Sequence, residues 1–172
     1  APSLARELGV SDVTAAVLVR RGYGDAAEAR RFLDADLPGH DPFLLGDMRE
    51  AVEGIRSAVS AKTRICVHGD YDVDGICATA LAVLVLRELG ADVAWHLPSR
   101  FEEGYGVSRD TLARLADEGV GLVLTVDCGI TAVEEVAEAR ARGLEVVVTD
   151  HHRPGEALPD CPIVATRPSS YP

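Results

Sequence analysis

The stretch "RICVHGDYDVDGICATALAVLVLRELG" at residues 64–90 passes from a short β-branched run through an acidic loop into a long apolar segment. The run "RICVHG" predicts a buried strand that ends at Gly69. The following segment is mostly apolar and closes at Gly90, which predicts a buried helix. A strand followed directly by a helix is the first half of a βαβ unit, so this stretch predicts the start of a parallel sheet.

The same alternation continues to the end of the chain. Further strands are expected at "DVAWHLP" (92–98), "GLVLTVDCG" (121–129), "LEVVVTD" (144–150) and "CPIVAT" (161–166). Helices are expected at 108–119, where Ser108 is a candidate cap, and at 131–143, where Thr131 and Glu134 have capping-box spacing. The strands are continuous apolar runs, as expected when helices cover both faces. The fold class is therefore α/β, with a mainly parallel, doubly wound sheet connected by right-handed crossovers.

Residues 1–62 lack strand character. Helices are expected at 11–21, with Ser11 as the cap, at 25–33, and at 47–61, where apolar residues recur on one face. We therefore expect a small helical N-terminal region over 1–62, followed by the α/β domain over 63–172.

Composition narrows the classes of function. The net charge of −11 over 172 residues argues against a general nucleic-acid coat, because phosphate binding favours a basic surface. That argument is reversed if divalent cations neutralise part of the acidity, or if a further part of the protein carries the basic surface. No stretch is long and apolar enough to span a membrane. The four cysteines form no Cys-x-x-Cys pair, which favours free thiols in a reducing cytoplasm.

Acids and imidazoles collect where the expected strands end. They are His68, Asp70, Asp72 and Asp74 after the first strand, Asp127 after the third, and Asp150, His151 and His152 after the fourth. Taken singly, Asp74 or Asp127 could be a helix N-cap and not a ligand. A lone histidine at a strand end is more often part of a structural hydrogen bond than a ligand. Together they lie at one edge of a parallel sheet, where ligands bind. Their mutual repulsion costs free energy unless cations are present.

The chemistry of this set favours hard or borderline metal ions. Carboxylates and imidazoles without a thiolate suit Mn²⁺, or Mg²⁺, better than a structural zinc. Several carboxylates exceed the needs of one ion, so we expect two ions about 3.5–4 Å apart. Such pairs activate water and stabilise charge on phosphate oxygens, which predicts hydrolysis of phosphate esters.

The motifs "HGDYDVDG", "VDCG" and "TDHH" occur in the order and spacing that resemble the DHH phosphoesterase superfamily. Together with "PSRFEEGYGVS" and the helical lead, they are most similar to the RecJ family of bacterial single-stranded-DNA-specific exonucleases. The resemblance implies a metal-dependent 5′-to-3′ exonuclease of DNA repair and recombination. It also implies single-stranded DNA as the substrate, a monomeric enzyme, and other repair or replication proteins as partners.

The resemblance implies a role for each motif residue. His68 and Asp72 would bind the first metal, Asp74 and His151 the second, and Asp127 would bridge the two. His152 would contact the scissile phosphate, and Asp150 would orient a histidine. Arg100, Tyr105 and Gly106 would hold the nucleic acid. Asp70 stays open between a solvated turn residue and a functional one.

Other functions remain compatible with the sequence. A catalytically inactive DHH-like scaffold that binds DNA or replication proteins would retain the fold, although the intact motifs disfavour it. A phosphodiesterase of short oligonucleotides would share the motifs, although "EEGYG" disfavours it. A receiver-like signalling domain would need a lysine at the pocket, and the only lysine, Lys62, precedes the first strand. The family carries a fourth motif, a second core domain and an oligonucleotide-binding barrel beyond the point where this chain stops. We therefore expect a fragment with weak or no activity alone.

Overall fold

The computed structural model describes residues 2–36, 39–101, 104–167 and 171. The chain divides into two compact units, Ala1–His40 and Asp41–Pro172. The first unit contains α1 (Pro2–Leu8), α2 (Asp12–Arg20) and α3 (Ala26–Leu33) around a small core of leucines and alanines. The side chain of Ser11 caps α2, as predicted, and Asp25 caps α3. Helix α1 was not expected from the sequence.

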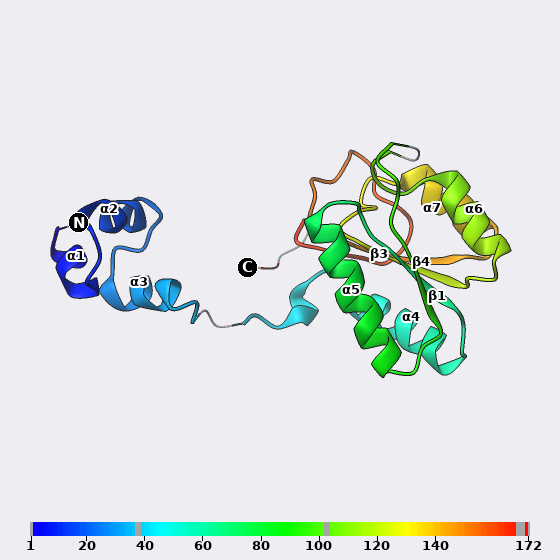
Figure 1. Ribbon diagram of the computed structural model, residues 1–172, viewed down its shortest axis with the longest axis horizontal. Helices are drawn as coiled ribbons and strands as arrows, with labels where there is room; N and C mark the ends of the chain where they lie inside the picture. The colour runs from blue at the N-terminus through cyan, green and yellow to red at the C-terminus, as the bar shows by residue number, and fades with distance from the viewer. Residues whose placement is uncertain (1, 37–38, 102–103, 168–170, 172) are drawn as a thin grey trace. The chain divides into compact units, whose positions relative to one another are not determined.

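The second unit is a five-stranded sheet with helices on both faces (Figure 1). Its strands are β1 (Ile65–His68), β2 (Val93–His96), β3 (Leu122–Val126), β4 (Glu145–Asp150) and β5 (Ile163–Ala165). Its helices are the short 3₁₀ turn η1 (Pro42–Leu44), α4 (Met48–Ser60), α5 (Val73–Glu88), α6 (Arg109–Asp117) and α7 (Val133–Ala141). The order is β2-β1-β3-β4-β5, and every pairing is parallel. The predicted α/β class is confirmed.

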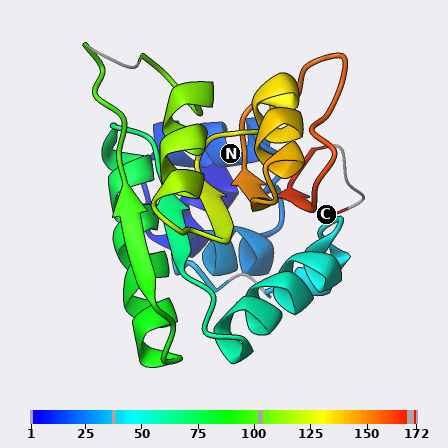
Figure 2. The same cartoon turned by 90° about the vertical axis from the view of Figure 1, so that its right-hand side faces the viewer.

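Two separate hydrophobic clusters explain why both faces of the sheet are apolar. On one face, α6 and α7 pack Leu112 and Val136 against Val123 and Val148 of the sheet. On the other face, α4 and α5 cover a second set of strand residues. In the turned view of Figure 2, α5 (green) and α4 (cyan) run in clearly different directions. The central strands β1 and β3 are buried along their full length, as their unbroken apolar sequence predicts.

Helix α4 belongs to the sheet unit, whereas the sequence placed it in the helical N-terminal region. Its buried Ala51 and Ala58 lie in the cluster that contains Ile65 and Val147. The division between compact units therefore falls at His40 and Asp41 and not at residue 62. The amphipathic pattern of α4 predicts the helix itself, but such a pattern does not specify which surface the apolar face contacts.

The expected capping box of α7 does not form. The helix begins one residue later than that pattern requires, with Ala132 at its cap and no side-chain hydrogen bond there. The carboxylate of Glu134 instead pairs with Arg109 of α6. A second carboxylate of α7, Glu138, lies 2.9 Å from the same guanidinium. An ion pair between neighbouring helices has therefore replaced the local cap.

Within the parts of the chain that the structure describes, none of the helices has the length and apolar character needed to cross a membrane.

Candidate metal centre

The strand ends of β1, β3 and β4 meet at one edge of the sheet. The parallel register pairs His68 of β1 with Thr125 of β3, and Val126 of β3 with Thr149 of β4. The residues that follow these positions therefore leave the sheet side by side. Strand order reverses between β1 and β3, because β2 lies on one side of β1 and all later strands lie on the other. Parallel sheets bind ligands at such a switch point.

The loop after β1 folds tightly against the start of α5. The side chain of Asp72 caps this helix by accepting a hydrogen bond from the Gly75 N–H at 3.0 Å. A Cβ at Gly75 would lie 2.5 Å from the backbone N and O of Asp70, and a Cβ at Gly69 would lie 2.0 Å from Thr79 Oγ1. The two glycines of this motif are therefore required by close approach. This packing turns Asp70 inward, where it is only 2% exposed.

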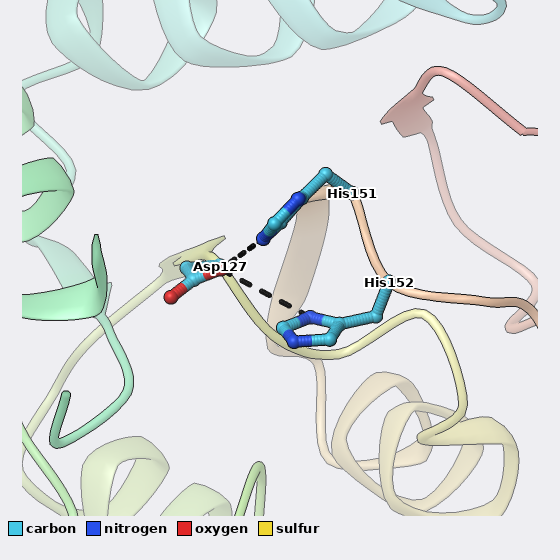
Figure 3. A group of neighbouring side chains, drawn as sticks. All are labelled: Asp127, His151 and His152. Carbon is cyan, nitrogen blue, oxygen red and sulfur yellow. Dashed lines mark ion pairs between the residues drawn. The ribbon is translucent and has the colours of Figure 1, made fainter. Parts of the chain in front are cut away.

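Asp127 lies at the centre of the site (Figure 3). Its backbone has a φ of 62°, in the left-handed region, and its side chain is buried. One carboxylate oxygen lies 2.9 Å from His151 Nε2 and 3.9 Å from His152 Nδ1. The two imidazole rings lie 4.7 Å apart between centroids. His151 and His152 are thus both directed toward one buried carboxylate.

Asp150 fixes the loop that carries the two histidines. Its Oδ1 accepts hydrogen bonds from the backbone N–H groups of His151 at 2.7 Å and His152 at 3.0 Å. Its Oδ2 accepts a third from the Ile130 N–H. Oδ1 also lies 2.8 Å from His152 Nδ1, and this contact raises the pKa of His152 above its ordinary value. Asp150 therefore contacts both the backbone and the ring of His152.

Two groups of side chains are close enough to hold a metal ion, and they share Asp127. One is Asp127, His151 and His152, and the other is Asp70, Asp72 and Asp127. Within each group the ligand atoms lie within 4.8 Å of one another. A carboxylate common to both groups is the arrangement expected for a bridge between two ions. Asp70, which the sequence left open, lies inside the second group.

The electrostatics of the site favour cations. Among the described residues, Asp70 Oδ1 and Asp127 Oδ2 are buried and accept no hydrogen bond. Burial, followed by the charge of Asp72, raises the pKa of Asp127, whereas the hydrogen bond from Gly75 lowers the pKa of Asp72. Buried carboxylate oxygens without donors are costly unless a cation contacts them. The donor set of oxygens and imidazoles therefore fits Mn²⁺ or Mg²⁺.

Two of the expected ligands lie beside these groups. His68 is completely buried at the end of β1, and its Nδ1 is 3.8 Å from the Cys128 sulfur. Asp74 is exposed in the first turn of α5. It lines an open groove of about 700 Å³, together with Asp127, Asp150 and His151. Both residues border the site, but neither belongs to the two groups that the described side chains form.

The expected substrate-binding residues lie in the connection from β2 to α6. The Arg100 guanidinium carbon is 5.2 Å from the centre of the Tyr71 ring, a cation–π contact that the sequence did not reveal. Tyr105 lies within hydrogen-bonding distance of His152, with its hydroxyl 3.2 Å from Nδ1. Gly106 follows with a φ of 85°, which favours glycine. Glu102 and Glu103 of the "EEGYG" motif lie outside the described residues.

Comparison with known proteins shows the family of the chain. The "DHH family, N-terminal domain" matches residues 64–170. The single-stranded-DNA-specific exonuclease RecJ of Bacillus subtilis (strain 168) is 42% identical over 161 residues, which are 92% of this chain and 20% of the relative. The chain thus spans about a fifth of that relative's length.

Solved structures give the same result. A crystal structure of exonuclease RecJ bound to manganese is similar with a TM-score of 0.68 and 44% identity, over 74% of this chain and 33% of the other. The RecJ of Thermus thermophilus in complex with Mn²⁺ has a TM-score of 0.74 and 34% identity, over 97% of this chain and 23% of the other. The family match covers the sheet, the acidic loop and the histidine pair described above, and on this basis the chain belongs to the DHH family.

Proposed function

We propose that this chain forms part of the catalytic core of a metal-dependent exonuclease that hydrolyses single-stranded DNA from its 5′ end. The observation that carries the proposal is the position of Asp127, whose carboxylate is shared by two groups of metal-competent side chains. Its relatives named as single-stranded-DNA-specific exonucleases, and the manganese in their structures, support the substrate and the metal.

The proposed division of roles follows the geometry. Asp127 would contact both ions, with Asp70 and Asp72 on one side and His151 on the other. His68 and Asp74 border the site and would complete the two sets of ligands. Two Mn²⁺ or Mg²⁺ ions supply activation of water and stabilisation of charge on the phosphate.

His152 is the proposed catalytic side chain. Asp150 holds its ring through Nδ1, which leaves Nε2 to face the scissile phosphate. The raised pKa of His152 favours the protonated ring, and this form stabilises negative charge as it develops on phosphate oxygens. Arg100 would contact a backbone phosphate of the DNA strand, because a guanidinium matches phosphate geometry.

The remaining properties are proposed for the protein as a whole. Because the match to this chain covers only 20% and 24% of the length of two RecJ relatives, we propose that further segments complete the site and grip the DNA. We propose a reducing cytoplasm as its location, which the four free thiols support. We propose a monomer that works with other proteins of DNA repair and recombination.

The test uses the full-length protein that contains this chain. Single-stranded DNA carrying a label at its 5′ or its 3′ end is incubated with Mn²⁺, and the released products are sized over time. The proposal requires the 5′ label to appear first as a mononucleotide, with duplex DNA resistant and Asp127→Asn inactive. Release of the 3′ label first, or equal cleavage by Asp127→Asn, would contradict it.

A further inference from the structure

The connection between β2 and α6 contacts the metal centre at two separate points. At its start, Arg100 stacks over Tyr71, which lies between Asp70 and Asp72 of the acidic loop. Near its end, Tyr105 contacts His152, 47 residues away in the sequence. This connection therefore bridges the loop after β1 and the loop after β4.

The backbone around Tyr105 is shaped for this contact. Gly104 and Gly106 have φ values of 82° and 85°, a conformation that L side chains rarely adopt. The Gly104 N–H donates to the Ser99 carbonyl at 3.2 Å and closes the turn. Tyr105 therefore lies between two positions whose backbone conformation favours glycine.

The contact itself has two components. The Tyr105 hydroxyl lies 3.2 Å from His152 Nδ1, and the two rings meet edge to face at 5.7 Å between centroids. The same Nδ1 lies 2.8 Å from Asp150 Oδ1. Burial, with nearby Asp150, raises the pKa of Tyr105, so its hydroxyl remains protonated and neutral. Because a carboxylate only accepts, Nδ1 carries the proton and donates it to Asp150, and the Tyr105 oxygen lies beside it as a second acceptor.

We infer that Tyr105 is a positioning residue for His152 and acts through that histidine on the DNA phosphate. This inference rests on the proposed function and changes the role that the sequence suggested for Tyr105, which was contact with the nucleic acid. With Nδ1 in contact with Asp150 and Tyr105, the ring is held in one orientation and Nε2 is left for the substrate. Arg100 lies in the same connection as Tyr105 and stacks over Tyr71 of the loop after β1. It then places the phosphate near a histidine that is already oriented.

The first test is Tyr105→Phe in the full-length enzyme, since it removes only the hydroxyl. Loss of one orienting hydrogen bond predicts a kcat about tenfold lower, with KM for single-stranded DNA unchanged within about twofold. The matched control is Tyr23→Phe, where the tyrosine stacks on Phe32 in the N-terminal unit. A higher KM with unchanged kcat, or activity equal to wild type, would overturn the inference.

The second test combines Tyr105→Phe with His152→Ala in single-turnover reactions. If Tyr105 acts through His152, the double variant is as slow as His152→Ala alone, because no ring remains to be positioned. A further tenfold loss in the double variant would show an independent role and refute the inference. Failure of the proposed function has a separate signature, because wild type and Tyr23→Phe would then leave single-stranded DNA intact.

Discussion

Replacing Asp127 by asparagine should change stability in opposite directions with and without metal. Asparagine keeps the shape of the side chain and tolerates the left-handed backbone at this position. Alanine does not, and it should cost about 1 kcal/mol more through backbone strain. Asp127→Asn therefore tests the carboxylate itself, and Asp127→Ala measures the strain.

Without metal, the asparagine variant should be the more stable protein near neutral pH. The pKa of Asp127 is raised in the folded state, so the favourable contribution of its protonated form is complete below the ordinary value of 3.8. That contribution is lost as the pH rises through the folded-state pKa. Asparagine does not titrate, so the advantage of the variant should grow as the pH rises and disappear in acid.

With Mn²⁺ the wild type should become more stable than the asparagine variant. At a metal concentration about 100 times Kd, the free energy of unfolding of the wild type increases by roughly 2.7 kcal/mol, and its Tm rises by about 5–10 °C. Loss of a carboxylate shared by both groups should weaken Mn²⁺ binding at least about a hundredfold. The metal then stabilises Asp127→Asn by roughly 0.4 kcal/mol at most and raises its Tm by about 1–2 °C.

The assay is thermal unfolding followed by fluorescence of Trp95, the single tryptophan, which lies in β2 and reports on the sheet unit. Asp117→Asn, at the exposed end of α6, is the matched control and should keep the full Mn²⁺ effect. A full Mn²⁺ effect in Asp127→Asn, or a lower metal-free stability than wild type at neutral pH, would contradict the proposed role of the Asp127 carboxylate.

Three further predictions concern neighbouring residues. Gly75→Ala should lower the free energy of unfolding by about 3 kcal/mol, because the added Cβ would meet the backbone of Asp70 at 2.5 Å. Denaturant unfolding measures this loss. Gly54→Ala is the control, since its Cβ would meet nothing closer than 4.0 Å. Asp150→Asn should remove the contribution of His152 to the pH dependence of stability. In the wild type the pKa of His152 is raised, so protonation of its ring stabilises the fold fully below pH 6.5. This contribution is lost as the pH rises through the folded-state pKa. Unfolding at a series of pH values would show the loss, and an unchanged pH profile would contradict it. His152→Ala should keep Mn²⁺ affinity within a few-fold but reduce turnover by about 10²–10⁴, and an equal loss of metal in His152→Ala and Asp127→Asn would mean that their roles are assigned wrongly.

Most of the fold could be predicted because the strands are unbroken apolar runs that end in polar residues. The position of α4 could not, since its amphipathic pattern fits any apolar surface and only the sheet contact of Ala51 and Ala58 decides it. Helix α1 is only seven residues long, which is too short for a clear periodic pattern.

The site was predictable in composition but only partly in arrangement. The order of motifs along the chain was sufficient to bring Asp127, His151 and His152 together, because parallel strands end at one edge. The direction of Asp70 depends on close contact between its backbone and Gly75, which a sequence pattern does not describe. The contact of Tyr105 with His152 joins two loops distant in sequence, so no local spacing predicts it.

Asp127 is proposed to be shared by two metal ions. The most direct measurement is anomalous diffraction from crystals of the protein grown with Mn²⁺, which locates each ion without reference to activity. Two peaks are expected, each within coordination distance of the Asp127 carboxylate, one on the side of Asp70 and Asp72 and the other on the side of His151. Peaks that lie away from Asp127, or a single peak that contacts neither Asp72 nor His151, would contradict it.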